Sequence, residues 1–241
     1  MVEPLTVNQV VAGSNPAGPV YYNQMYSYNC YYGTPVYIKD IDIADEQISV
    51  MVDYFETRRQ YVGENNTYFG DKGNDTQILS LPQFECLIGP INDAVSEYLS
   101  SITQNSHFYE SYIMKSWPII LEQNGGISKH YHHNSHLSVV YYLNDSLPED
   151  EGNLTFHRRK DHDLRQIGIR FYDLNTDVSG SYVPVQAKRN RLVVFPSSVN
   201  HLVTEYLGTT PRYSISCDIV NVKVEGDLEN TLTSPHSWVK L

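Results

Sequence analysis

The sequence predicts a mostly β fold with flanking helices and a core of the jelly-roll kind. Between residues 107 and 224, short apolar or alternating runs are separated by turn residues such as Asn124-Gly125-Gly126 and Ser179-Gly180. This pattern corresponds to about eight short strands, among them Ile167–Tyr172 and His201–Tyr206, as in a sandwich or barrel. Two segments upstream carry apolar residues at helical spacing, and helices that precede a run of strands are expected to pack outside the sheet.

The chain is predicted to consist of an arm, one domain and a tail. Residues 1–29 are rich in Asn, Gly, Pro, Ser and Tyr, which is typical of turns and loops, so we expect an arm that lies on the domain or on a partner. A single all-β domain can reach the remaining length. We therefore assign residues 30–225 to one domain, with helices at 44–60 and 83–103 and the barrel at 107–224, and residues 226–241 to a polar tail.

Two helices are expected before the barrel. Ile48, Met51 and Phe55 are spaced to line one face of the first helix. The second has Pro82 at its start, where a missing backbone N–H costs little. Pro90 lies inside its apolar stripe and predicts a kink or a broken first turn.

Composition argues against several classes of partner. The net charge is −11, with 28 acidic and 17 basic residues, which disfavours broad binding to nucleic acid or to anionic membranes. No apolar run approaches the roughly 20 residues of a membrane span, and no secretory signal precedes the domain, so a cytoplasmic location is expected. Cys30, Cys86 and Cys217 form no CxxC motif, which fits a reducing compartment.

The spacing of three histidines indicates a metal site. His130 and His132 are two residues apart, so on an extended segment both side chains point the same way. His201 follows a second apolar run and can complete one face of the site. Imidazole nitrogen suits Fe, Zn, Cu and Ni. The side chain of His133 points the opposite way on an extended segment, and His136 lies past a turn. We take both as non-ligands, with His136 as the reserve ligand. The histidines with no partner spacing are expected at the surface: His107, His157, His162 and His236.

A second group of polar side chains shares one face of the last predicted strand. Alternation places Arg212, Ser214 and Ser216 together. An inward arginine is costly unless it is paired, so three interpretations stay open: a buried ion pair, an outward side chain, or a clamp for a ligand carboxylate. Tyr142 can likewise be a core residue or an inward phenol donor.

The order of these motifs resembles the 2-oxoglutarate/Fe(II)-dependent oxygenase family, within the prolyl-hydroxylase-like group of double-stranded β-helix enzymes. The pattern HxH…NSxLSxVYYL…FPSxxxH…RxS reads here as His130-Tyr-His132, Asn134–Leu143, Phe195–His201 and Arg212-Tyr-Ser214. The resemblance covers about residues 31–224.

The resemblance implies a double-stranded β-helix, or cupin-like, core with Fe(II) in its mouth. His130 would be the first ligand and His201 the distal ligand, and Arg212 with Ser214 would clamp the far carboxylate of 2-oxoglutarate, aided by Tyr142. The implied reaction uses O₂ and 2-oxoglutarate, releases succinate and CO₂, and hydroxylates a C–H bond of peptidyl proline or another small polar substrate.

The middle ligand departs from the wider superfamily, which usually has a carboxylate where this chain has His132. Three neutral imidazoles leave the site about one charge more positive than two histidines and a carboxylate. Asp145 and Glu151 are poor substitutes because they lie beyond the next strand. The substrate pocket is expected from loops 61–76, 144–152 and 157–166.

Two other functions fit the residues. One is a cupin-like protein that holds a metal with three histidines and does not use 2-oxoglutarate. The other is a non-catalytic β-barrel for binding or assembly, with the arm as its contact. Whatever the function, a protein contact through the arm and a homo-oligomeric state are also expected. Metal content and tolerance of Arg212→Ala separate the three.

Overall fold

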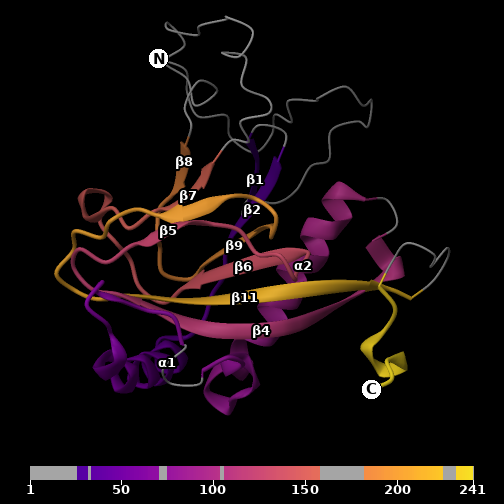
Figure 1. The fold of residues 1–241 in the computed structure, drawn as a ribbon, viewed down its shortest axis with the longest axis horizontal. Coiled ribbons are helices and arrows are strands. Elements are labelled where there is room, and N and C mark those ends of the chain that lie inside the picture. The colour runs from indigo at the N-terminus through magenta and orange to yellow at the C-terminus, as the bar shows by residue number, and fades with distance from the viewer. Residues whose placement is uncertain are drawn as a thin grey trace, which may run out of the picture.

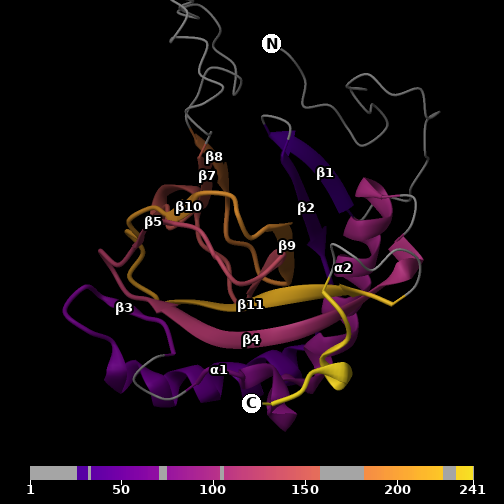
Figure 2. The same ribbon diagram turned by 45° about the vertical axis from the view of Figure 1, so that its right-hand side comes forward.

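Two facing β-sheets, with helices on one outer side, form the core of the computed structural model (Figures 1 and 2). The structure describes residues 26–31, 34–70, 75–103, 106–157, 182–224 and 232–240. The strand expected at 167–172, His162 and residues 1–25 of the arm lie outside these ranges.

Within the described residues the strands are all antiparallel to their neighbours and form one seven-stranded and one four-stranded sheet. In spatial order, the larger sheet contains β1 (Tyr26–Tyr31), β2 (Thr34–Asp40), β9 (Arg191–Pro196), β6 (Leu137–Tyr142), β11 (Arg212–Lys223), β4 (Tyr109–Leu121) and β3 (Thr67–Tyr68). The smaller sheet contains β5 (Ile127–His130), β10 (His201–Val203), β7 (Leu154–His157) and β8 (Tyr182–Val185).

Helical segments precede and connect the strands. The main helices are α1 (Asp45–Arg58) and α2 (Ile88–Ile102). Short 3-10 segments occupy Arg59–Tyr61, Ile78–Ser80, Pro82–Leu87, Ser106–Phe108, Pro148–Asp150 and Pro235–Ser237. The second predicted helix is thus divided, because Pro90 sits in the first turn of α2 and residues 82–87 are wound as a 3-10 helix.

Alternation along the strands of the larger sheet divides its side chains between two cores. Tyr141 and Ile215 pack against the helices, in a cluster that includes Met51 and Phe55 of α1. Tyr142 belongs instead to the cluster between the sheets. Because neighbouring residues on a strand point to opposite faces, both faces of this sheet are buried. The sequence prediction of a mostly β jelly-roll fold with outer helices is therefore confirmed.

Three local expectations need correction. Residues 61–76 were expected to form a loop, but Thr67–Tyr68 pairs with β4 as strand β3. The strand expected from His201 to Tyr206 ends at Val203. His157 was expected at the surface but is half-buried at the end of β7.

The predicted boundary between arm and domain falls inside a strand. Residues 26–31 form β1, which pairs with β2 at one edge of the larger sheet. The predicted domain end at residue 225 comes just after β11. In the described ranges, no helix has the length and apolar character that crossing a membrane would require.

Candidate metal centre

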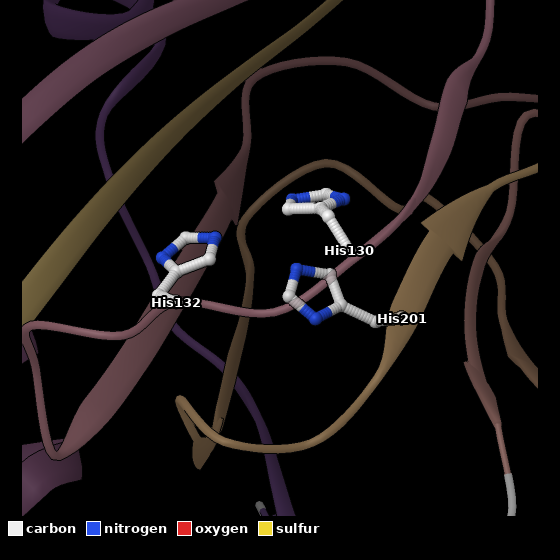
Figure 3. A group of neighbouring side chains, drawn as sticks. All are labelled: His130, His132 and His201. Atoms are coloured by element: carbon white, nitrogen blue, oxygen red, sulfur yellow. The ribbon is translucent and has the colours of Figure 1, made fainter.

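The imidazole rings of three histidines, His130, His132 and His201, converge on one another (Figure 3). His130 ends β5, and it is the cross-strand partner of His201, which begins β10. His132 follows two residues after β5 ends. One nitrogen from each ring lies within 4.8 Å of one from each of the others, so the group could hold a metal ion.

Each ring is oriented by a hydrogen bond at Nδ1. His130 Nδ1 lies 2.8 Å from the carbonyl oxygen of Ser128, and His201 Nδ1 lies 2.8 Å from that of Val199. A carbonyl oxygen only accepts, so Nδ1 carries the proton in both rings and Nε2 presents its lone pair. Such partners fix both the tautomer and the direction of a ligating histidine.

Burial keeps these imidazoles neutral. Burial lowers the pKa of His130, and it lowers the pKa of His201 to about 3. Neutral imidazole is the form that ligates a metal, so both rings are in the ligating state at pH 7 without any proton being lost.

His132 has a carboxylate behind it instead of a carbonyl. Its Nδ1 lies 2.5 Å from Oδ1 of Asp218, on β11. Burial raises the pKa of Asp218, but the hydrogen bond from His132 and the ion pair with Lys115 outweigh it, and the pKa lies below its usual value. The carboxyl group is therefore ionised at neutral pH.

Arg212 and Tyr142 face the same space from the larger sheet. Arg212 is 1% exposed, and its Nη1 donates to the carbonyl oxygen of Gly152. Its Nη2 lies 3.5 Å from Ser214 Oγ, and its guanidinium carbon lies 5.2 Å from the centre of the Tyr142 ring. Arg212 Nε and Tyr142 Oη have no hydrogen-bond partner among the described residues.

The histidines and the arginine line one cavity of about 50 Å³. That volume holds a few water molecules, so a larger ligand requires lining side chains to turn aside. The apolar part of the lining comprises Phe69, Trp117, Ile119, Ile127, Val139, Val140, Leu154, Phe195 and Val203. Of the loops expected to form the substrate pocket, 61–76 contributes Phe69, and residues 158–166 lie outside the described ranges.

The remaining candidates lie away from this cavity. His136 was the reserve ligand, but its Nδ1 accepts a hydrogen bond from the backbone N–H of Asn221 at 2.9 Å. His133 is exposed. Asp145 accepts from the backbone N–H of Arg189, and Glu151 is exposed, so neither carboxylate joins the histidines.

Sequence reasoning missed Asp218. The sequence pattern could have revealed it, because Arg212, Ser214, Ser216 and Asp218 occupy every second position of the same strand and so share one face. All of these residues are buried on the inner face of β11.

The fold and this cluster define a jelly-roll protein with a three-histidine candidate metal centre. Residues 115–218, which contain all of the candidate site residues, match the family model described as "Putative 2OG-Fe(II) oxygenase". This match to the family model agrees with the resemblance seen in the motifs. The motifs predicted an oxygenase that uses Fe(II) and 2-oxoglutarate. This function, the enzyme class, the metal and the cosubstrate are those of the matched family.

Solved structures share the fold at low sequence identity. HygX from Streptomyces hygroscopicus, with nickel and 2-oxoglutarate bound, has a TM-score of 0.52 and 9% identity over 78% of this chain and 83% of that chain. AviO1 from Streptomyces viridochromogenes Tue57 has a TM-score of 0.51 and 11% identity over 83% of this chain and 92% of that chain. No sequence among the curated proteins matches the chain.

Proposed function

We propose that His130, His132 and His201 hold Fe(II), and that Arg212, Ser214 and Tyr142 bind 2-oxoglutarate beside it. The substrate is a small polar molecule or a peptide, such as one presenting a prolyl residue, that is hydroxylated at a C–H bond. The observation that carries this proposal is the buried guanidinium of Arg212, which has no acidic partner among the described residues and lines the same cavity as the histidines.

A buried cation requires an anion. Within the described part of the chain, Arg212 meets a carbonyl and a hydroxyl but no carboxylate. Burial lowers the pKa of Arg212, yet an arginine stays charged at neutral pH. Leaving such a charge unpaired costs several kcal/mol by the general magnitude for buried ions. An anionic ligand removes this cost, and a carboxylate matches the guanidinium fork.

The polar atoms of the site fit a dicarboxylate and a metal. The lone pairs on Nε2 of His130 and His201 suit a divalent transition metal. The unpartnered Nε of Arg212 and Oη of Tyr142 are donors for one carboxylate. The donor set therefore matches a ligand with one end on the metal and the other on Arg212.

Bound iron with 2-oxoglutarate supplies the oxidising chemistry, which consumes O₂ and releases succinate and CO₂. The chain itself has other tasks. His130, His132 and His201 would hold the metal. Arg212 orients the cosubstrate, and Phe69, Trp117 and Val203 keep the cavity dry.

The two alternative functions explain fewer features of the site. A three-histidine cupin that does not use 2-oxoglutarate leaves the guanidinium of Arg212 without an anion. A non-catalytic module leaves the three converging imidazoles without a role. Contacts through the arm, a homo-oligomeric state and the cytoplasmic location stay predictions.

An anaerobic titration with Fe(II), with and without 2-oxoglutarate, tests the proposal. We expect a visible metal-to-ligand charge-transfer band that needs both components. His201→Ala should abolish it, whereas His133→Ala, which removes an exposed histidine next to the cluster, should leave it unchanged. A wild-type protein without this band, or a band that survives His201→Ala, would contradict the proposal.

A further inference from the structure

Asp218 is a buried anion one hydrogen bond away from the histidine cluster. It is 1% exposed and lies on the inner face of β11, directly across from Ser138 of β6 and Lys115 of β4. Its Oδ1 meets His132 Nδ1 at 2.5 Å and accepts from Ser138 Oγ at 3.1 Å. Its Oδ2 lies 3.1 Å from Lys115 Nζ.

The partners of Asp218 differ in their accessibility. The Lys115 side chain is 48% exposed, so water screens its charge. Its ammonium is also shared with the Trp117 ring, whose centre lies 4.7 Å away. The His132 side chain is 13% exposed, and its contact with the carboxylate is the shorter one. The dominant partner of Asp218 is therefore the imidazole.

The backbone of His132 is held as well as its ring. Its N–H donates to the carbonyl oxygen of Ser197 at 2.9 Å. Ser197 Oγ lies 2.9 Å from Ser138 Oγ, which in turn donates to Asp218. These two hydroxyl groups connect the loop that carries His132 with the buried carboxylate.

The charge of the site favours the same role. A divalent metal held by three neutral imidazoles keeps two positive charges in a buried site, whereas a site with two histidines and one carboxylate keeps one. A carboxylate hydrogen-bonded to a ligating imidazole makes that ring more basic and fixes its tautomer. Asp218 thus brings a negative charge to the metal through His132.

We propose that Asp218 is the positioning residue of the metal centre: it accepts the Nδ1–H of His132, aims Nε2 at the position shared with His130 and His201, and supplies the charge that a carboxylate ligand would supply directly. The proposal rests on the proposed metal binding.

Asp218→Asn tests this role without removing volume. The amide can donate to Nδ1, which places the ring proton on Nε2 and blocks ligation. The affinity for Mn(II) should fall by about 10- to 100-fold. It is measured on the full chain, without O₂ or substrate, from the electron paramagnetic resonance signal of the Mn(II) that remains free in solution. Asp75→Asn, at another buried aspartate away from the cluster, should leave Mn(II) affinity unchanged.

A double-mutant cycle with His132→Ala separates positioning from general damage. Once His132 is absent, Asp218→Asn should weaken Mn(II) binding no further. Equal losses in both backgrounds would overturn the proposal, because Asp218 would then act independently of His132. Wild-type protein that binds no Mn(II) would overturn the metal site and this proposal together, whereas wild-type binding with an unchanged Asp218→Asn affinity overturns this proposal alone.

A measurement on the unaltered chain covers the case in which Asp218→Asn does not fold. The ¹⁵N shifts of the His132 ring, assigned by their loss in His132→Gln, should report a protonated Nδ1 and a bare Nε2 at neutral pH. The opposite tautomer would overturn the proposal.

Discussion

The guanidinium of Arg212 has an unusual set of neighbours for a buried charge. Among the described residues it contacts the carbonyl of Gly152, the hydroxyl of Ser214 and the ring of Tyr142, all of them uncharged. In most folded proteins a fully buried charge is paired. The residue therefore costs stability in the ligand-free chain and recovers that cost when an anion binds.

Arg212→Met separates these two effects. The substitution removes a buried charge and keeps most of the apolar volume, so the melting temperature of the ligand-free protein should not fall. Affinity for 2-oxoglutarate, measured by calorimetry with Mn(II) present, should fall by at least about 100-fold, since a charge-assisted bidentate contact is lost. A large drop in stability with unchanged affinity would show instead that Arg212 is structural.

At the scale of elements, β11 organises the site. Its inner face carries Arg212, Ser214, Ser216 and Asp218, and its outer face packs apolar side chains such as Ile215 against the helices. Pairing with β4 and β6 on both sides makes it a central strand, so its inner side chains have little freedom. Arg212, Ser214 and Ser216 thereby line the cavity, and Asp218 lies behind His132 on the same face of the strand.

Helix α1 is attached to the strands by a buried carboxylate. Asp75 is 6% exposed and accepts from Tyr54 Oη at 2.5 Å, Arg58 Nε at 2.8 Å and Tyr68 Oη at 2.8 Å. Tyr54 and Arg58 belong to α1, whereas Tyr68 belongs to β3. Burial raises the pKa of Asp75, but these hydrogen bonds outweigh it and lower the pKa below 3.8.

The folded pKa of Asp75 lies below the unfolded one, so its ionised form contributes stability above the unfolded pKa, and that contribution is lost as pH falls through the folded pKa. Asp75→Asn should therefore lower the free energy of unfolding by about 1–3 kcal/mol at pH 7. The difference from wild type, measured by urea unfolding, should narrow below pH 3.8. A difference that does not change with pH would show that the charge of Asp75 is not involved.

At the scale of the whole molecule, the candidate centre joins the two sheets. His130 and His201 come from the smaller sheet, and Asp218 and Arg212 come from the larger one. Ligands that bridge these groups bind only the folded chain, so they should stabilise it as a whole.

Mn(II) with 2-oxoglutarate, each at about 100 times its dissociation constant, should add about 2.7 kcal/mol per ligand. For a chain of this size, each such increment should raise the melting temperature by about 5–10 °C, measured by calorimetry. Chelation with EDTA should reverse the effect. A shift from 2-oxoglutarate that persists after chelation would place its binding away from the metal.

The sequence predicted the elements better than their ends. Apolar spacing located both helices and most strands, because amphipathic periodicity is a local property. The strand that begins at His201 was predicted to end later than it does, and strand β3 was not predicted. Short strands depend on pairing partners that are distant in the chain, so the local pattern does not define them. Pro90 was correctly taken as an interruption.

The sequence by itself determined the jelly-roll class and singled out His130, His132, His201 and Arg212 as candidate site residues, because side-chain alternation on a strand and the order of motifs are properties of the chain itself. Only the tertiary structure decided that Arg212 is buried without an acidic partner in the described residues and that Asp218 stands behind His132. The register of β11 against its neighbours and the smaller sheet above it set both facts. Burial and cross-strand contact arise from segments far apart in sequence, so no local pattern contains them.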